Sequence, residues 1–389
     1  MSRISELLDR ASAATRLDDF GSDSYREGLE ILVFSADAQA RLNERGRAMF
    51  DGQIVDLLSR RLEVEHWYAL HPEIDEPEIV APLIGLGLPR TGSTAFSCLL
   101  AEDPAVRFIR TWEGDMPCPP PESATEHSDP RIAASAQRIE LTNQYFPRLK
   151  AMLPLSATGP IECQNFMAYD FKSQTFLATA RLPDYTRWLL HEADLVPTYR
   201  YLKRVLKLLQ WRCPPSRWRL KNPSHTAFIG ALDAVFPDAR YWMTHRDIAS
   251  VIPSVVDLYR EMSGPNTDAL DTDHIVRTNI DWWELGMQRL IAFREAGQGH
   301  RFFDVHFATF QQDPIAVIAD LYAFLGEPLT DETRRRMAIW RQENPADKHG
   351  RNRYDAAALG IDIAELRQTF RFYSEYFGVA EANPASSGA

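Results

Sequence analysis

Cysteine is scarce in this sequence, and its placement excludes two common uses of it. The chain of 389 residues has 4 cysteines, which are far apart and form no Cys-x-x-Cys pair and no Cys/His group. A zinc site or a disulfide framework would need such groups, so we expect neither. Free thiols are typical of a reducing compartment, and we therefore expect a cytoplasmic protein. The cysteines are Cys98, Cys118, Cys163 and Cys213.

An excess of positive charge is also missing. Lys and Arg total 43 against 54 Asp and Glu, which gives a formal net charge of −11 at pH 7. A protein with this charge is not expected to take a nucleic acid or an anionic membrane surface as its main partner. Any site for an anion must then be a local basic pocket within an acidic molecule.

Long apolar runs are absent too. No segment approaches the roughly 20 apolar residues that cross a bilayer. The N-terminal segment carries charges throughout, unlike a secretory leader. We therefore expect no transmembrane segment, while peripheral contact with a membrane that holds a lipid substrate stays open. With 45% hydrophobic and 25% charged residues, the composition is that of a soluble globular enzyme with a sizeable core.

The spacing of apolar residues divides the chain into a helical start and an α/β body. Residues 1–76 have apolar positions at helical spacing, which predicts a helical N-terminal extension. From 77 to about 380, short apolar runs alternate with helical patterns, which predicts one α/β domain with a parallel sheet flanked by helices. The expected strands are 78–87, 106–111, 217–221, 239–246 and 300–307, and the expected helices include 93–101, 224–236, 247–261 and 313–325.

The alternation of strands and helices breaks between about residues 112 and 213. A proline-rich loop, DMPCPPPESATEHSDP, comes first, and several helical patterns follow it. We interpret this stretch as a helical insertion on the substrate side of the sheet. Its Trp, Tyr, Phe and Leu residues favour an apolar acceptor, although such residues also build ordinary cores. The final residues, 381–389, are expected to form a disordered tail.

A glycine-rich stretch, GLGLPRTGST at 85–94, follows the first expected strand. Gly87 and Gly92 allow a tight turn, and the start of the next helix would present backbone N–H groups to an anion. A Walker A loop would carry a lysine where this chain has Ser93. The missing lysine argues against an NTPase, and Arg90 instead offers a bidentate cation within the turn.

A second basic position follows the strand expected at 239–246. Arg246 closes that strand, and Ser254 lies eight positions later, two turns into the next helix. In an open parallel sheet, ligands bind beyond the carboxyl ends of the strands, so both side chains can face one ligand there. The pattern therefore favours a second anion contact, separate from the glycine-rich loop.

Together, the two stretches resemble the signature of sulfotransferases that use 3′-phosphoadenosine 5′-phosphosulfate (PAPS). The run from Pro89 to Thr94 is similar to their 5′-phosphosulfate loop, with an arginine where cytosolic members usually carry lysine and many bacterial members carry arginine. The pair Arg246 and Ser254 resembles their 3′-phosphate motif. The resemblance covers about residues 78–378 and implies a P-loop-like fold, PAPS as co-substrate and no metal. It assigns donor binding to Arg90, Thr91, Gly92, Ser93, Thr94, Arg246 and Ser254.

A third basic segment lies near the C-terminus. It resembles the late basic loop of bacterial members, which precedes a Tyr…Phe-Gly ending, here FYSEYFGV. The resemblance implies that Arg351 and Arg353 close over the nucleotide, and a solvated charge run is the alternative. The Gly-x-x-Gly-x-x-Lys motif of cytosolic members is absent. The segment contains Lys348, His349, Arg351, Arg353 and Tyr354.

Sulfuryl transfer from such a donor would be an in-line displacement at sulfur, which needs fixed positive charge and a base. Arg90 and the loop amides suit the charge that develops on the leaving phosphate. The resemblance adds Lys221, in a Leu-Lys-x-Pro segment, as a second cation. It also places the base soon after the strand that follows the loop, where Glu113 stands.

The identity of the base stays open at this point. Glu162, within GPIECQNF, is an alternative to Glu113. Among the histidines, His225 suits a helix start or a substrate contact, and His245 suits the orientation of Arg246.

The predicted function is the transfer of a sulfuryl group from PAPS to a hydroxyl or amine of a small-molecule, lipid or glycan acceptor. A P-loop nucleotide kinase or NTPase is one alternative, and a catalytically inactive nucleotide-binding module is another.

Overall fold

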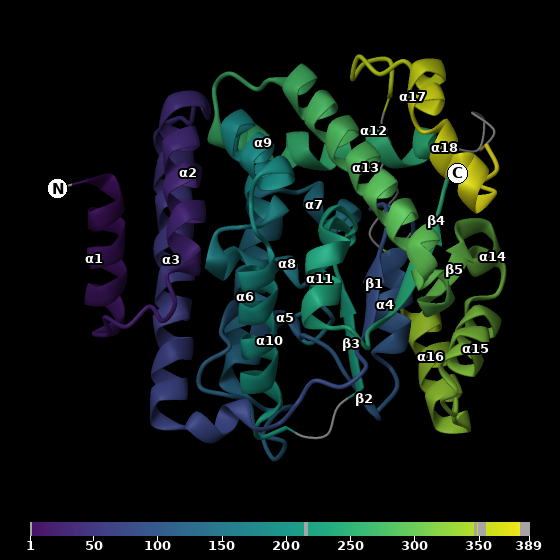
Figure 1. Cartoon of the computed structure of the whole chain (residues 1–389), viewed down its shortest axis with the longest axis horizontal. Coiled ribbons are helices and arrows are strands. Elements are labelled where there is room, and N and C mark those ends of the chain that lie inside the picture. The colour runs from purple at the N-terminus through teal and green to yellow at the C-terminus, as the bar shows by residue number, and fades with distance from the viewer. Residues whose placement is uncertain (1, 214–216, 346–347, 349–354, 382–389) are drawn as a thin grey trace.

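A parallel sheet forms the centre of the computed structural model, which describes residues 2–213, 217–345, 348 and 355–381 (Figure 1). Within those residues, five strands run in the order β2-β3-β1-β4-β5, and each pair of neighbours is parallel. The predicted α/β class is therefore confirmed. The strands are β1 (Leu83–Leu86), β2 (Val106–Arg107), β3 (Arg217–Lys221), β4 (Arg240–His245) and β5 (Phe302–His306).

The strand order creates a switch point beside β1. This strand pairs with β3 on one side and β4 on the other, so that Gly85 lies level with both Lys221 and Trp242. At such a point the connections leave the sheet toward opposite sides and open a crevice at the carboxyl ends of the strands. The two basic motifs both begin there, one after β1 and the other after β4.

All five strands lie within the expected ranges, but the ranges 78–87 and 106–111 are too long. β2 ends at Arg107, because the chain then leaves the sheet. Arg110 forms an isolated antiparallel bridge with Pro160, and the helix α5 begins at Thr111. An apolar alternation alone does not reveal that a neighbouring loop takes over the pairing.

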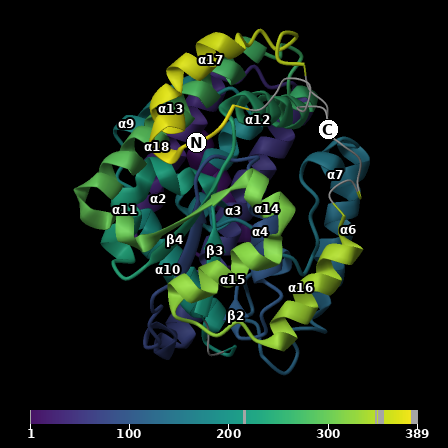
Figure 2. The same ribbon diagram turned by 90° about the vertical axis from the view of Figure 1, so that its right-hand side faces the viewer.

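Side chains alternate between two apolar layers, one on each face of the sheet. Ile84 and Met243 point into a larger core shared with α12 and α13, whereas Leu83 and Trp242 point into a smaller one formed with α4, α15 and α16. Figure 2 shows α14 and α15 in front of the strands. The helices around the sheet are α4 (Ser93–Leu100), α11 (Ile229–Val235), α12 (Ile248–Ser263), α13 (Thr272–Phe293), α14 (Phe307–Gln312), α15 (Pro314–Leu325), α16 (Asp331–Glu343), α17 (Ile363–Thr369) and α18 (Arg371–Phe377).

The N-terminal helices and those of the predicted insertion pack beside the sheet (Figure 1). One apolar core joins side chains of α1–α3, α10 and the sheet. The fully buried Arg61 forms an ion pair with Asp170 at 3.3 Å and so links the N-terminal helices to the insertion. These helices are α1 (Arg3–Thr15), α2 (Ser24–Gln39), α3 (Glu44–Leu70), α5 (Thr111–Asp115), α6 (Pro130–Tyr145), α7 (Leu149–Met152), α8 (Gln164–Met167), α9 (Pro183–His191) and α10 (Val196–Gln210).

The domain limits at 76, 112 and 213 stay an interpretation of the sequence, and the tail predicted at 381–389 lies outside the described residues except for its first. Within the described ranges, every helix is too short or too polar to cross a membrane. Short helical segments complete the chain: η1 (Pro72–Asp75), η2 (Ala168–Asp170), η3 (Gln174–Ala178), η4 (Pro223–Phe228), η5 (Gly264–Asn266), the kinked η6 (Arg294–Gln298) and η7 (Gly299–Arg301).

Candidate active site

The loop between β1 and α4 is a tight turn built on left-handed backbone conformations. Gly87, Arg90 and Gly92 have φ angles of +119°, +62° and +87°. Gly92 directly precedes α4, and a β-carbon there would lie 3.1 Å from the ring of Phe307. The backbone conformation therefore favours glycine, and a side chain there would crowd Phe307. The turn directs the first N–H groups of α4 toward the region beyond the sheet.

The hydroxyl groups of the loop divide into two roles. Thr91 is fully buried, donates to the Leu88 carbonyl at 2.9 Å and contacts the Thr244 hydroxyl of β4 at 2.5 Å. Its side chain therefore fastens the loop to the sheet, and only its backbone can serve a ligand. Ser93 and Thr94 line a cleft beside the loop.

The two predicted arginines meet at this cleft. Arg246 donates from Nη1 to the backbone carbonyl of Arg90 at 3.2 Å, and Arg90 donates from Nε to the Ser254 hydroxyl at 3.0 Å. Arg90 also donates from Nη1 to the Met152 carbonyl at 2.5 Å, so the insertion reaches the loop. Because Arg90, Arg246 and Ser254 line the same cleft, the structure brings the two sequence motifs together.

Lys221 and Glu162 form an ion pair at the carboxyl end of β3. The Glu162 side chain is 22% exposed, and its other oxygen accepts from Gln164 at 2.5 Å. Cys98 lines the cleft, and burial raises the pKa of its thiol to about 11. The positive charge of Lys221 has the opposite, smaller effect on this pKa. Glu162 is therefore a partly exposed carboxylate beside a cation, and neither Glu162 nor Lys221 is among the residues that line the cleft.

Glu113 has a different environment. It is fully buried and accepts from Arg107 Nη2 at 2.8 Å, from Arg110 Nη1 at 3.1 Å and from the Arg110 backbone at 3.0 Å. Both carboxylate oxygens are thus held by donors, and the residue does not line the cleft. The contact between Arg110 and Glu113 could have been predicted from the sequence, because residues three apart are neighbours on a helix surface.

The two candidate histidines lie in the interior. His225, in η4, is fully buried, and its Nδ1 contacts the Tyr199 hydroxyl at 2.8 Å. Burial lowers the pKa of His225 to about 3. His245 is also buried, and its Nε2 lies 2.9 Å from Asp304. Neither histidine lines the cleft.

Comparison with known proteins assigns the chain to a family. The profile of the "Sulfotransferase family" matches residues 82–331, which include the loop, Lys221 and the Arg246–Ser254 pair. The chain belongs to the sulfotransferase family. This membership confirms the resemblance drawn from the motifs and favours sulfotransferases over NTPases.

Solved structures of two mycobacterial sulfotransferases are similar over nearly the whole chain. STF9 from Mycobacterium avium has a TM-score of 0.91 and 33% identity, covering 98% of this chain and 98% of that chain. STF1 from Mycobacterium tuberculosis H37Rv has a TM-score of 0.85 and 28% identity, covering 95% and 98%.

A curated relative matches over a shorter segment. This is the omega-hydroxy-beta-dihydromenaquinone-9 sulfotransferase Stf3 of Mycobacterium tuberculosis, 32% identical over 113 residues. The match spans 28% of this chain and 28% of the relative.

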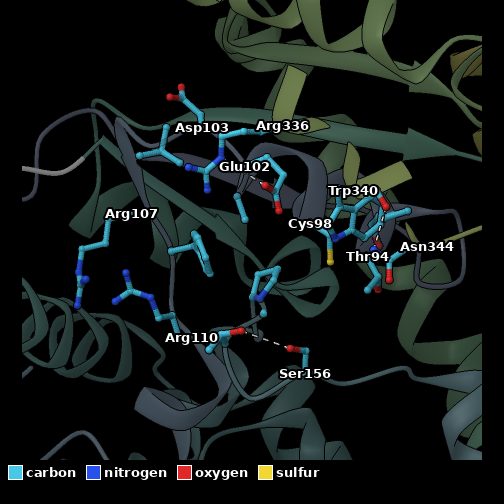
Figure 3. Close-up of a pocket in the computed structure, with 18 of the residues that line it drawn as sticks. Thr94, Cys98, Glu102, Asp103, Arg107, Arg110, Ser156, Arg336, Trp340 and Asn344 are labelled. Carbon is cyan, nitrogen blue, oxygen red and sulfur yellow. Dashed lines mark hydrogen bonds and ion pairs between the residues drawn. The ribbon is translucent and has the colours of Figure 1, made fainter. Parts of the chain in front are cut away.

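The cleft of this sulfotransferase has a volume of about 1880 Å³. Typical small-molecule pockets measure about 300–1,000 Å³, so there is room for a nucleotide and an acceptor together. Figure 3 shows Thr94, Cys98 and Trp340 on one side of the cleft and Arg107 and Arg110 on the opposite side. No sequence motif pointed to α16, whose contribution depends on tertiary packing. Arg336 and Trp340 of this helix and Asn344, directly after it, line the cleft.

The third basic segment is described only in part. Lys348 lines the cleft and donates to Asn344 Oδ1 at 2.9 Å. Arg351 and Arg353 lie outside the described residues, as do His349 and Tyr354. Among the residues that are described, no group of three or more His, Cys, Asp or Glu side chains could hold a metal ion.

Proposed function

We propose that this protein transfers a sulfuryl group from PAPS to a hydroxyl or amine of an acceptor, releasing adenosine 3′,5′-bisphosphate. The observation that carries the proposal is the meeting of Arg90, Arg246 and Ser254 in one cleft at the start of α4. The donor has anionic groups at both ends of its nucleotide. A cleft with two guanidiniums and the first turn of a helix suits a ligand of that charge.

In this proposal, the loop and α12 hold opposite ends of the donor. Arg246 and Ser254 bind the 3′-phosphate, while Arg90 and the loop from Thr91 to Thr94 bind the 5′-phosphosulfate. Thr91 would contribute its backbone, because its hydroxyl is engaged within the fold. Arg351 and Arg353 would close over the nucleotide.

The acceptor oxygen attacks sulfur while the bond from sulfur to the bridging phosphate oxygen breaks. Arg90 and Lys221 stabilise the negative charge that moves onto the leaving phosphate. We assign the base to Glu162 in preference to Glu113, because Glu162 is partly exposed whereas Glu113 is buried between two arginines. Glu162 takes the proton of the acceptor.

The acceptor is proposed to be a small, apolar or lipid-like alcohol. Apolar and aromatic residues line part of the cleft, among them Phe108, Leu155 and Trp340. The name of Stf3 gives a menaquinone derivative as the substrate of that relative, which supports an acceptor of this class. The protein is proposed to act in the cytoplasm, where the donor nucleotide would be supplied.

We expect Arg246→Ala to weaken the binding of adenosine 3′,5′-bisphosphate by about ten- to a few-hundredfold. A hydrogen bond to a charged group contributes about 1.5–3 kcal/mol, and about 1.4 kcal/mol is a factor of ten. Calorimetric titration measures the effect. Arg240→Ala, at the opposite end of β4, serves as the matched control. An unchanged dissociation constant for Arg246→Ala would remove the 3′-phosphate role.

A pair of assays tests the function itself. Adenosine 3′,5′-bisphosphate is expected to raise the melting temperature more than ATP with magnesium does, since binding to the folded state alone stabilises it. Incubation with PAPS and a panel of alcohols and amines, read by mass spectrometry, is expected to yield a sulfated product. Binding without any product would favour the inactive nucleotide-binding module, and preference for ATP would favour an NTPase.

A further inference from the structure

The C-terminal helices α17 and α18 hold the turn that carries Arg246. Tyr373 of α18 is fully buried, and its hydroxyl oxygen meets three groups of this turn. It lies 3.4 Å from the backbone nitrogen of Arg246, 3.5 Å from the Arg246 carbonyl oxygen and 3.4 Å from Nδ1 of His245. A single side chain therefore contacts the backbone on both sides of the Arg246 α-carbon.

The hydrogen bonds around His245 can be given a direction. Asp304 accepts from Nε2 of His245 and also binds Arg294 at 2.8 and 2.6 Å. Burial lowers the pKa of His245, which favours the neutral ring. With its proton on Nε2, the ring has an acceptor at Nδ1 for the Tyr373 hydroxyl proton. The Tyr373 oxygen can then accept from the Arg246 N–H, so a chain of hydrogen bonds runs from Asp304 to the backbone of Arg246. The one hydroxyl proton of Tyr373 can alternatively be donated to the Arg246 carbonyl oxygen, which also fixes the backbone of Arg246.

The next residue of the turn is held by α17. Arg367 donates to the Asp247 carboxylate at 2.7 Å, and Asp247 caps α12 by accepting from the Ala249 N–H at 3.1 Å. The side chain of Arg246 itself extends toward the loop, with its guanidinium carbon 4.4 Å from the centre of the Phe307 ring. The C-terminal helices thus contact the backbone at Arg246 and the side chains of both its neighbours.

We propose that Tyr373 is a positioning residue for the 3′-phosphate contact, which it orients through the backbone of Arg246 and through His245. This inference rests on the proposed function, in which Arg246 binds the 3′-phosphate. It also gives a physical reason for the FYSEYFGV ending, whose first tyrosine is Tyr373. A guanidinium binds a phosphate well only when two of its N–H groups point at the phosphate oxygens. Mobility of the turn that carries Arg246 would therefore weaken the binding of the 3′-phosphate and of no other part of the nucleotide.

The test compares two nucleotides that differ only in the 3′-phosphate, adenosine 3′,5′-bisphosphate and adenosine 5′-phosphate. Calorimetric titration gives the ratio of their dissociation constants, which is the 3′-phosphate preference. Tyr373→Phe is expected to lower this preference by about three- to tenfold, the effect of a few weak hydrogen bonds, and to leave the adenosine 5′-phosphate constant unchanged. The matched control is Tyr185→Phe. Tyr185, in α9, is also fully buried, and its hydroxyl donates to backbone carbonyls elsewhere in the fold.

Each outcome has a separate meaning. A preference that is intact in Tyr373→Phe but lost in Arg246→Ala overturns the role of Tyr373 and leaves the proposed function standing. An equal loss for both nucleotides also overturns it, because it indicates general loosening of the site. A wild-type protein without any preference overturns the proposed function instead. If Tyr373→Phe does not fold, Arg367→Ala tests the same support, with a reduced preference expected and an unchanged one contradicting the proposal.

Discussion

Replacing Arg90 with alanine is expected to lower kcat by about 10²–10³-fold, the usual effect of removing a donor that stabilises transition-state charge. Arg90 stands inside the loop that would hold the phosphosulfate, and its guanidinium reaches Ser254 and the Met152 carbonyl. The loss should fall mainly on the chemical step, because the bridging oxygen gains most of its charge there. Initial rates at saturating PAPS, together with donor affinity from titration, separate turnover from binding.

Two further variants sharpen this prediction. Arg90→Lys keeps the charge but loses the planar fork, so it is expected to recover part of the rate. Arg41→Ala controls for the backbone, since Arg41 is an exposed arginine that also has a left-handed conformation, with φ of +51°. A rate for Arg90→Ala within a factor of two of wild type would show that the loop binds the donor without assisting the transfer.

Glu162→Gln is expected to reduce kcat by about 10²–10⁴-fold, the range for losing a general base, with donor affinity preserved. The amide keeps the size of the side chain and a carbonyl oxygen for Lys221, so the fold and the cation stay in place. The measurement is again initial rate against donor affinity. A rate near that of wild type would return the role to another residue.

Glu113→Gln distinguishes the two carboxylates. Glu113 is buried between Arg107 and Arg110, and removing one charge from a buried pair costs about 3–5 kcal/mol. We therefore expect a lower melting temperature for Glu113→Gln, with turnover kept at temperatures where the protein is folded. Normal stability together with lost turnover in Glu113→Gln would make Glu113 the base and contradict our assignment.

The fold and the two motifs were predictable because each depends on a short segment. An apolar run that ends in glycines predicts β1 and its loop, whatever the rest of the chain does. The same holds for β4 and Arg246. The length of β2 was not predictable, since it depends on Pro160, which lies far along the chain and forms the bridge to Arg110.

Which glutamate is the better candidate base also depends on contacts with distant segments. Glu113 and Glu162 are equally acidic as residues in a sequence, and both follow plausible patterns. Their environments differ because Arg107 and Arg110 enclose one carboxylate, while the other meets Lys221 and Gln164 at a partly open edge. Burial and charge partners come from segments that pack together, and a linear pattern does not contain them.

The order of residues alone determined the family to which the protein belongs. Two motifs indicate it: a glycine-rich loop that lacks the Walker lysine and carries Arg90, and a second basic turn at Arg246. Folding decided which of those residues share one cleft, which carboxylate is sealed between guanidiniums, and that the C-terminal helices support Arg246. The physical reason is range, because turns and helix starts are set by neighbours a few positions away, whereas burial and charge pairing are set by whichever distant segments the core brings into contact.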